Sequence, residues 1–211
     1  MNVLDRWGKL WSSSRNPHDM QNEWATPRDL FALADAHWGF GLDAASLWAS
    51  RCTDAYLGPD HEDERRRDAL ALPAGTWVRL AQAEGRLMDK TAVWCNPPYG
   101  RGMRVWTERF NQEGEFGTVV VLTFARVDTR WWWRDVLGRD ADGNRIPEVN
   151  CAKSITWLQG RLAFLSPETW EPIKAKNGRA QVAPAPSVLI EFAPGPKRDW
   201  PENLTISELT P

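Results

Sequence analysis

Residues 93–100 read Val-Trp-Cys-Asn-Pro-Pro-Tyr-Gly, an apolar run that ends in an amide, two prolines and a tyrosine. The apolar half predicts a buried strand over 92–95, and the prolines end it because they fix φ and lack a backbone N–H. Asn96 therefore lies at the carboxyl end of a strand. That place suits an ordinary turn, and it also suits a loop that performs chemistry, so the flanking segments have to distinguish the two.

The segments around this strand alternate between helical and extended patterns. Upstream, Thr26 is a good N-cap and Pro27 suits a first turn, which predicts a helix over 27–37 followed by a strand at 40–43. The small residues after Asp43 predict another helix, and residues 58–90 are expected to be mostly irregular. Downstream, the pattern predicts a helix over 102–113, a buried strand over 118–125, a helix over 128–137, and strands over 154–158, 161–165 and 187–192.

This alternation indicates an α/β fold, a doubly wound sheet that closes with an antiparallel C-terminal hairpin. In such sheets ligands bind outside the carboxyl ends of the strands, so Asp43 and Asn96 point to one shared site. Residues 23–195 are expected to form a single domain. A flexible arm at 1–22 and a tail at 196–211 are expected on either side of it.

The composition is that of one soluble globular domain, with 211 residues, 42% of them hydrophobic and 26% charged. The amino terminus lacks the apolar core of a secretory signal, and no apolar run is long enough to span a bilayer, so a cytoplasmic location is expected. The three cysteines and three histidines show no zinc-ligand spacing, which predicts reduced thiols and no metal site. The net charge of −2 argues only weakly against a nucleic-acid partner.

The order amide, proline, proline, tyrosine suits chemistry on a planar aromatic amine such as N6 of adenine. The lone pair of such an amine is delocalised into its ring, so two acceptors on its hydrogens would favour a pyramidal, more nucleophilic nitrogen. The Asn96 side-chain oxygen and the Pro97 carbonyl can be those acceptors. Pro97 and Pro98 stiffen the loop and remove two donors, while Tyr99 offers a flat face on which a base could stack.

Asn96-Pro97-Pro98-Tyr99 resembles the catalytic motif of amino-group methyltransferases that use S-adenosylmethionine. The wider pattern is more specific, because residues 23–27 (Glu-Trp-Ala-Thr-Pro), 39–46 (Gly-Phe-Gly-Leu-Asp-Ala-Ala-Ser) and 94–100 occur in the order found in phage and prophage DNA adenine N6-methyltransferases, the Dam-like group. Later segments fit as well, so the resemblance covers residues 23 to 193.

The resemblance implies a Rossmann-like, S-adenosylmethionine-dependent enzyme that methylates an adenine flipped out of double-stranded DNA. It implies a catalytic role for four residues, Asn96, Pro97, Pro98 and Tyr99. It implies cofactor binding by six others: Thr26, Pro27, Asp43, Ala44, Ala45 and Asp68. Two features depart from the family pattern, because the loop after Asp43 lacks the usual glycines and an insertion over 71–92 follows the segment of Asp68.

Contacts to DNA phosphates need only cations on the correct face of the protein. The candidates are Arg126, Arg130, Lys174, Lys176 and Arg179. The last three belong to a long loop at 166–186, for which DNA contact and disorder are competing interpretations.

The segment 128–137 contains two further hypotheses. Asp128 either caps the predicted helix or lines the catalytic pocket. The tryptophans at 131, 132 and 133 cannot all point inward, since adjacent helical positions are about 100° apart, so at least one is expected to be exposed.

Two other functions compete with DNA adenine methylation. An N-methyltransferase that acts on RNA or on a protein glutamine would share the Asn96–Tyr99 motif, although the flanking phage-like segments disfavour it. A non-catalytic nucleic-acid-binding module would be distinguished by its failure to bind S-adenosylmethionine.

Overall fold

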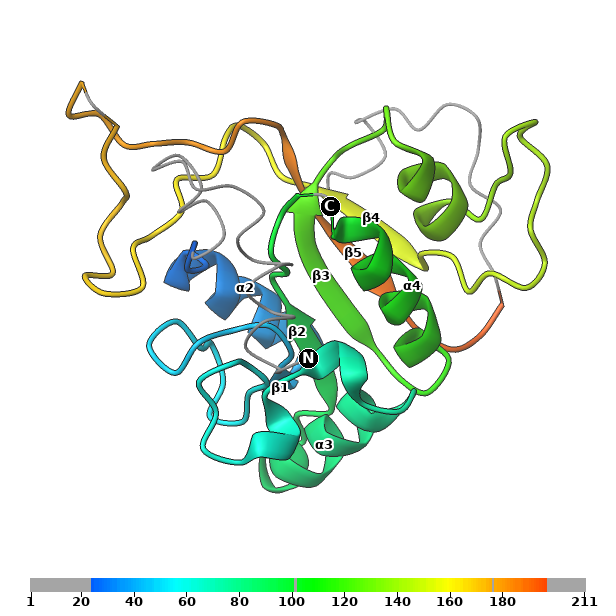
Figure 1. The fold of residues 1–211 in the computed structure, drawn as a ribbon, viewed down its shortest axis with the longest axis horizontal. Helices are drawn as coiled ribbons and strands as arrows, with labels where there is room; N and C mark the ends of the chain where they lie inside the picture. Colours follow the sequence, from blue (N-terminus) through cyan, green and yellow to red (C-terminus); the bar gives the residue numbers. More distant parts are fainter. Residues whose placement is uncertain (1–23, 101, 176, 197–211) are drawn as a thin grey trace.

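The computed structural model describes residues 24–100, 102–175 and 177–196, which form a five-stranded sheet in the order β1-β2-β3-β5-β4 (Figure 1). The strands are β1 (Phe40–Asp43), β2 (Ala92–Cys95), β3 (Val119–Phe124), β4 (Ser154–Trp157) and β5 (Ser187–Phe192). The first three run parallel, whereas β5 is antiparallel to β3 and β4 is antiparallel to β5. This arrangement confirms the α/β class that the sequence predicts.

Helices cover both faces of the sheet, because side chains alternate between the faces along each strand. On one face, α3 (Thr76–Gly85) and α4 (Met103–Gly114) contribute to a core that contains Leu42, Val93 and Val121. On the other face, α2 (Arg28–Trp38) packs in a second core with Phe40, Trp94 and Leu122. The parallel strands β1 and β2 end at the same edge of the sheet, which brings Asp43 and Asn96 to one side of the molecule.

Helix α3 contradicts the expectation that residues 58–90 are irregular. It begins after Gly75, whose φ of 77° lies in the left-handed region that favours glycine, and it buries Trp77, Val78 and Ala81. Its charged and polar positions obscure this apolar face in the sequence. The insertion over 71–92 therefore contains a helix of 10 residues that packs on β1 and β2.

A buried ion pair in α4 anchors the chain that leads into α3. Arg109 and Glu113 lie one turn apart, with 2.6 Å between a guanidinium nitrogen and a carboxylate oxygen. Arg109 also donates to the carbonyls of Leu72 and Pro73, at 2.6 and 2.9 Å. Glu113 accepts a hydrogen bond from the backbone N–H of Val78 at 3.2 Å. Both side chains of the ion pair thus bind backbone groups of the insertion, and they stabilise its position on the sheet.

The structure differs from the sequence-based prediction at three elements: the helix after Asp43, the strand over 161–165 and the C-terminal hairpin. After Asp43 no helix follows: the N–H of Ala44 donates to the carbonyl of Trp94 and that of Ser46 to the carbonyl of Leu57, and these residues form a bend. Residues 161–165 make isolated bridges to separate segments rather than a strand. The antiparallel strands β4 and β5 are joined through residues 158–186, so they do not form a tight hairpin.

The helix predicted over 128–137 is shorter than expected. It contains a π-helical turn, η5 (Trp132–Val136), in which hydrogen bonds join residues five apart: the N–H of Leu137 donates to the carbonyl of Trp132 at 3.0 Å. Trp132 is buried and Trp133 is 49% exposed, which confirms that the three tryptophans do not all point inward.

The predicted arm at 1–22 and nearly all of the predicted tail at 196–211 lie outside the described residues. The three cysteines are free thiols, and Cys95 and Cys151 are buried. In the part of the chain that the structure describes, no helix is both long and apolar enough to cross a membrane.

Candidate active site

The half-buried side chain of Asn96 is held at both ends of its amide. Its Nδ2 donates to the backbone carbonyl of Trp24 at 2.9 Å. Its Oδ1 accepts from the hydroxyl of Tyr99 at 2.6 Å, and that hydroxyl also lies 3.3 Å from the carbonyl of Leu122. A carbonyl on one side and a hydroxyl donor on the other fix which way the amide points. The acceptor oxygen of Asn96 therefore faces Tyr99.

Tyr99 belongs to an aromatic cluster formed by Trp24, Tyr99, Phe124 and Phe164. Its ring stacks on Phe124 with centroids 4.2 Å apart and an interplanar angle of 23°. Trp24 approaches the same ring edge-on at 6.3 Å, and Phe164 lies tilted to it at 6.0 Å. Burial raises the pKa of the Tyr99 hydroxyl well above its usual range, so the group stays protonated and remains a donor.

Three members of this cluster were not identified from the sequence as site residues. Trp24 and Phe164 come from distant segments, which are joined by hydrogen bonds in both directions between Ala25 and Leu165, at 2.9 and 3.1 Å. Phe124 is the last residue of β3. All three residues fall inside segments that carry the family resemblance, which are 23–27 for Trp24, 120–131 for Phe124 and 160–164 for Phe164. This resemblance was the only signal for them as site residues.

Asp43 lies at the end of β1 and uses its carboxylate within its own loop. Oδ1 accepts from the backbone N–H of Ala45 at 3.3 Å, and Oδ2 accepts from that of Cys52 at 3.0 Å. Burial raises the pKa of this carboxyl from 3.8 to about 6, and its hydrogen bonds and the Arg28 guanidinium oppose the rise. The carboxylate thus shapes the loop through backbone contacts.

The other predicted cofactor residues gather around this loop. Thr26 is buried and lies beside the Cys52 thiol, and Pro27 directly precedes α2. Ala44 and Ala45 are buried and carry no polar side chain. The Ser46 hydroxyl lies close enough to lower the pKa of Asp43, yet it makes no well-formed hydrogen bond to any described residue. A small-residue loop with one buried hydroxyl available fits a ligand that approaches the backbone closely.

Asp68 is buried and begins a short helical turn, η3 (Ala69–Ala71). Its Oδ1 accepts from the backbone N–H groups of Leu70 and Ala71, at 3.1 and 3.2 Å. Ala69 packs in the same core as Ala44 and Ala45. The structure therefore brings the turn that follows Asp68 into the same core as the Asp43 loop, although the insertion follows it in the sequence.

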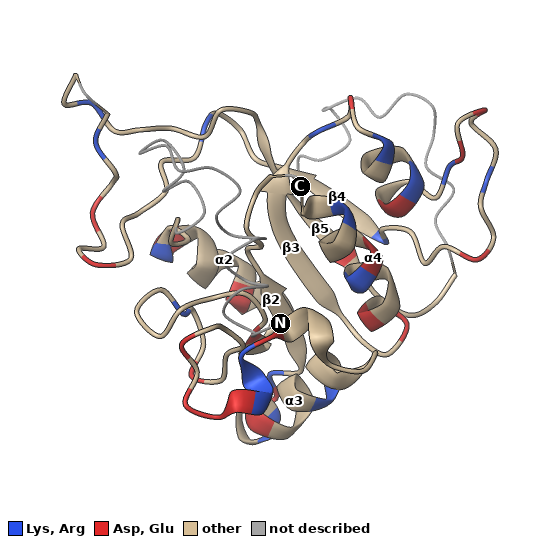
Figure 2. Cartoon of the chain, in the orientation of Figure 1, with Lys and Arg blue, Asp and Glu red and all other residues tan. Residues whose placement is uncertain are grey.

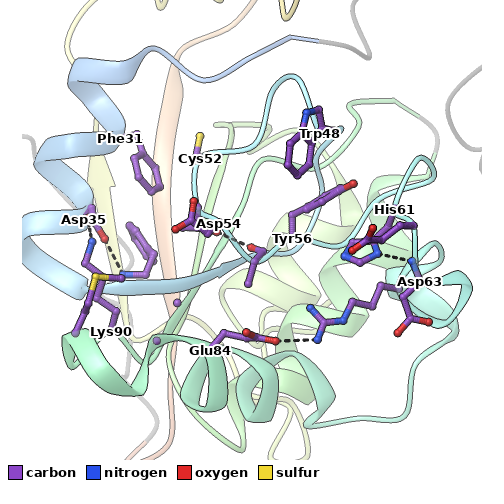
Figure 3. A pocket seen from close by; sticks show the side chains of 18 of the residues that line it. Phe31, Asp35, Trp48, Cys52, Asp54, Tyr56, His61, Asp63, Glu84 and Lys90 are labelled. Carbon is purple, nitrogen blue, oxygen red and sulfur yellow. Dashed lines mark hydrogen bonds and ion pairs between the residues drawn. The ribbon is translucent and has the colours of Figure 1, made fainter.

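A cavity of about 850 Å³ opens at the outer edge of β1, beside the Asp43 loop (Figure 3). Phe31, Trp48 and Tyr56 contribute aromatic walls, and Cys52 connects it to Asp43. Its charged lining comprises the acids Asp35, Asp54, Asp60, Glu62, Asp63 and Glu84 and the cations Arg66 and Lys90. Neither Asn96 nor Tyr99 lines it. An acidic wall repels phosphates and attracts cations, so this cavity does not suit DNA.

The cations predicted to contact DNA have different surroundings. Arg126 forms a two-point ion pair with Asp128, at 2.9 and 3.0 Å, so the Asp128 carboxylate binds this arginine rather than the start of the helix. A role for Asp128 at the catalytic pocket stays a prediction. Arg130 is exposed and has no charged partner among the described residues. In Figure 2 the Lys and Arg positions of the 125–137 segment and those of the long loop lie on separate parts of the ribbon.

Residues 161–175 and 177–183 form a projecting arm that contains most of the described part of the long loop. Backbone N–H groups of Ile173, Gln181 and Ala183 donate to carbonyls across the arm, at 3.2, 2.6 and 2.7 Å. Lys174 and Arg179 lie near its tip and are exposed, and Lys174 bridges to Ala180. Lys176 lies outside the described residues. The arm projects away from the sheet on the side of α2 (Figure 1).

Comparison with known proteins shows the family of this chain. A family model described as DNA N-6-adenine-methyltransferase (Dam) matches residues 13–191. The DNA N-6-adenine-methyltransferase of Escherichia phage T1 is 24% identical over 183 residues, which cover 81% of this chain and 65% of that protein. The chain thus spans less than two thirds of the length of this curated relative. No solved structure matches the chain.

Proposed function

The chain belongs to the DNA N-6-adenine-methyltransferase family, and on that premise we propose that it transfers a methyl group to the N6 amino group of adenine in DNA. The observation that carries the proposal is the family match over residues 13–191, in which Asn96 stands at a strand end with its acceptor oxygen turned toward an aromatic ring. The segments that flank this strand end, rather than the motif alone, favour adenine in DNA over another planar amine.

The chemical role of Asn96 follows from its hydrogen bonds. Because the Trp24 carbonyl occupies Nδ2, the amide cannot rotate without losing that bond. Oδ1, which accepts from the Tyr99 hydroxyl in this structure, is therefore the atom that would accept from an incoming amine. The Pro97 carbonyl would accept the second amine hydrogen, held still by the fixed φ of Pro97 and Pro98. Two acceptors aimed at the amine stabilise the positive charge that develops on nitrogen as it attacks. The proton then leaves to water.

Tyr99 would hold the adenine ring by stacking. A base inside a duplex is stacked and paired, so the proposed reaction requires the target adenine to be flipped out of the helix. The Tyr99 ring is the one planar group whose hydroxyl already contacts Asn96, so a base that stacks on it brings its amine next to the same acceptor.

We propose S-adenosylmethionine as the methyl donor, held by Thr26, Pro27, Asp43, Ala44, Ala45 and Asp68. The fit rests on small side chains in the loop, on the available hydroxyl of Ser46, and on the acidic cavity that adjoins Asp43. When bound, this cofactor would supply an electrophilic methyl group on a positively charged sulfur. Asp43 would contribute by fixing the loop through Ala45 and Cys52.

DNA would approach the edge of the sheet that carries Asn96. Arg130 and the arm cations Lys174 and Arg179 are the proposed phosphate contacts, because each is exposed and none forms an ion pair with a described residue. Arg126 is a weaker candidate, since Asp128 already neutralises it. Lys176 lies outside the described residues, and we propose it as a phosphate contact from its charge alone.

The proposal is tested with methyl-labelled S-adenosylmethionine and three substrates in parallel: unmethylated genomic DNA, total RNA and a protein extract. We expect label in DNA alone, recovered as N6-methyladenine after hydrolysis. Label in RNA or protein would instead support the other amine substrates. Calorimetry that finds no binding of the cofactor would support a non-catalytic DNA-binding protein.

A further inference from the structure

The aromatic cluster surrounds Tyr99 unevenly. Phe124 lies nearly parallel to it, with centroids 4.2 Å apart and planes inclined by 23°. Trp24 and Phe164 meet the Tyr99 ring at 62° and 60°. In a steeply inclined pair the edge of one ring meets the other ring, whereas two nearly parallel rings at short distance cover one face of each other. Phe124 therefore covers one flat face of Tyr99, in the way a stacked base would cover it.

We propose that Phe124 fills the base slot of the DNA-free enzyme and leaves it when the target adenine enters, an inference that rests on the proposed function. Contacting rings lie about 3.5 Å apart, so a base between two rings needs roughly 7 Å between them. The 4.2 Å between the centroids of Phe124 and Tyr99 is far less. A base and Phe124 cannot cover this face of Tyr99 together.

Phe124, rather than its neighbours, is the ring placed to move. Trp24 and Phe164 stack on each other with centroids 4.7 Å apart, and the hydrogen bonds between Ala25 and Leu165 tie their segments together. Phe124 ends β3, and the exposed residues 126–128 follow it closely. Its side chain is 8% exposed, and a turn of the ring toward that loop would leave the backbone pairing of Phe124 with Ser187 in place.

The Phe124 ring takes the place of the adenine ring, and the Tyr99 hydroxyl takes the place of the adenine amine. It donates to Asn96 Oδ1 at 2.6 Å, the bond that the adenine amine would form in its place. The stacking face and the hydrogen-bond acceptor are thus both satisfied within the protein. Base entry exchanges each contact for one of the same kind, and a base stacks on an aromatic side chain more strongly than a phenylalanine does.

The substitution Phe124→Leu tests the proposal, because leucine keeps apolar volume and lacks a flat face. We expect the KM for unmethylated genomic DNA to fall by about fivefold, from the lost competing stack, with a smaller change in kcat. Phe192→Leu is the matched control, since Phe192 also ends a strand in the core but lies at the opposite end of the β3–β5 ladder. Phe124→Met is the second variant if the leucine protein does not fold.

The wild-type enzyme separates this test from that of the proposed function. If it forms no N6-methyladenine in the same DNA, the proposed function fails, and the inference fails with it. If it does, a raised KM or a lowered kcat in Phe124→Leu would show that Phe124 is a fixed wall of the slot. An unchanged KM, or an equal fall in Phe192→Leu, would also overturn the inference.

Discussion

At the end of β1 the carboxylate of Asp43 accepts hydrogen bonds from the backbone of its own loop, whereas at the end of β2 the amide of Asn96 contacts Trp24 and Tyr99. The first residue is fully buried and the second is half-buried. Asp43 therefore works on local loop geometry, and its loss should change the shape of a binding site. The Oδ1 atom of Asn96 accepts a hydrogen bond from the Tyr99 side chain. Loss of Asn96 should therefore lower the rate of methyl transfer.

The largest expected effect is on the rate after Asn96→Ala. Removing one preorganised group that stabilises developing charge should lower kcat by about a thousandfold, with little change in the affinity for S-adenosylmethionine. Methyl incorporation into DNA and calorimetry with the cofactor measure the two quantities. Asn150→Ala is the control, because this buried amide donates to Asn111 away from the site. A similar loss of kcat in the control would mean that Asn96 acts through stability.

The second largest expected effect is on how the free energy of unfolding depends on pH, through the Asp43 carboxyl. Its pKa is raised from 3.8 to about 6, so the folded state binds this proton more tightly than the unfolded chain does. The stability from this group is therefore greatest below pH 3.8 and decreases as the pH rises to about 6. The decrease amounts to about 3 kcal/mol.

Asp43→Asn should remove this part of the pH dependence, since the amide does not titrate in this range. Urea unfolding of both proteins at several pH values between 4 and 7 measures the difference between their slopes. Equal slopes would show that the Asp43 carboxyl is not the titrating group, and the contrast between a structural carboxylate and a chemical amide would lose its main support.

A smaller effect is expected from Tyr99→Phe, which keeps the stacking face and removes the hydroxyl from Asn96. With the acceptor free, the KM for DNA should fall by about fivefold, the value of one modest hydrogen bond. Steady-state methylation of genomic DNA measures it. A higher KM would indicate that the hydroxyl itself helps to bind the base, and that the site is not satisfied by internal contacts before DNA arrives.

The smallest expected effect separates two arginines that lie beyond the end of β3. Arg130→Ala should lower the slope of log affinity against log salt by about 1, as for one lost phosphate contact. Arg126→Ala should change it less, because Asp128 holds the Arg126 side chain at 2.9 Å. DNA binding measured across a salt series gives both slopes. The reverse order would place the DNA backbone at Arg126.

Much of the sheet could be predicted from the sequence, because its buried strands are short apolar runs with clear ends. Residues 92–95 are followed by Asn96 and a proline pair, and β3 is apolar along nearly its whole length. Helix α3 was missed because its burial depends on partners far away in the chain, the Arg109–Glu113 pair among them. The segment after Asp43 was predicted as helix, since small residues do not reveal that Trp94 and Leu57 will accept from their N–H groups.

At the candidate site, the sequence identifies residues but not their contacts. Asn96 and Tyr99 were recognisable from their order, and their assignment to substrate stays a prediction. The bond from Asn96 to the Trp24 carbonyl could not be predicted, because a backbone group carries no side-chain signal. The stacking of Phe124 on Tyr99 depends on how far β3 extends past β2, which a sequence pattern does not define.

The link between Asn96 and Trp24, closed by the pairing of Ala25 with Leu165, has a consequence for synthesis of the chain on the ribosome. The site joins segments that are separated by long stretches of sequence, so its contact order is high. A nascent chain carries the whole motif at 96–99 long before Phe164 has been made. We therefore expect chains that stop before residue 164 to lack methylation, even though every motif residue is present in them.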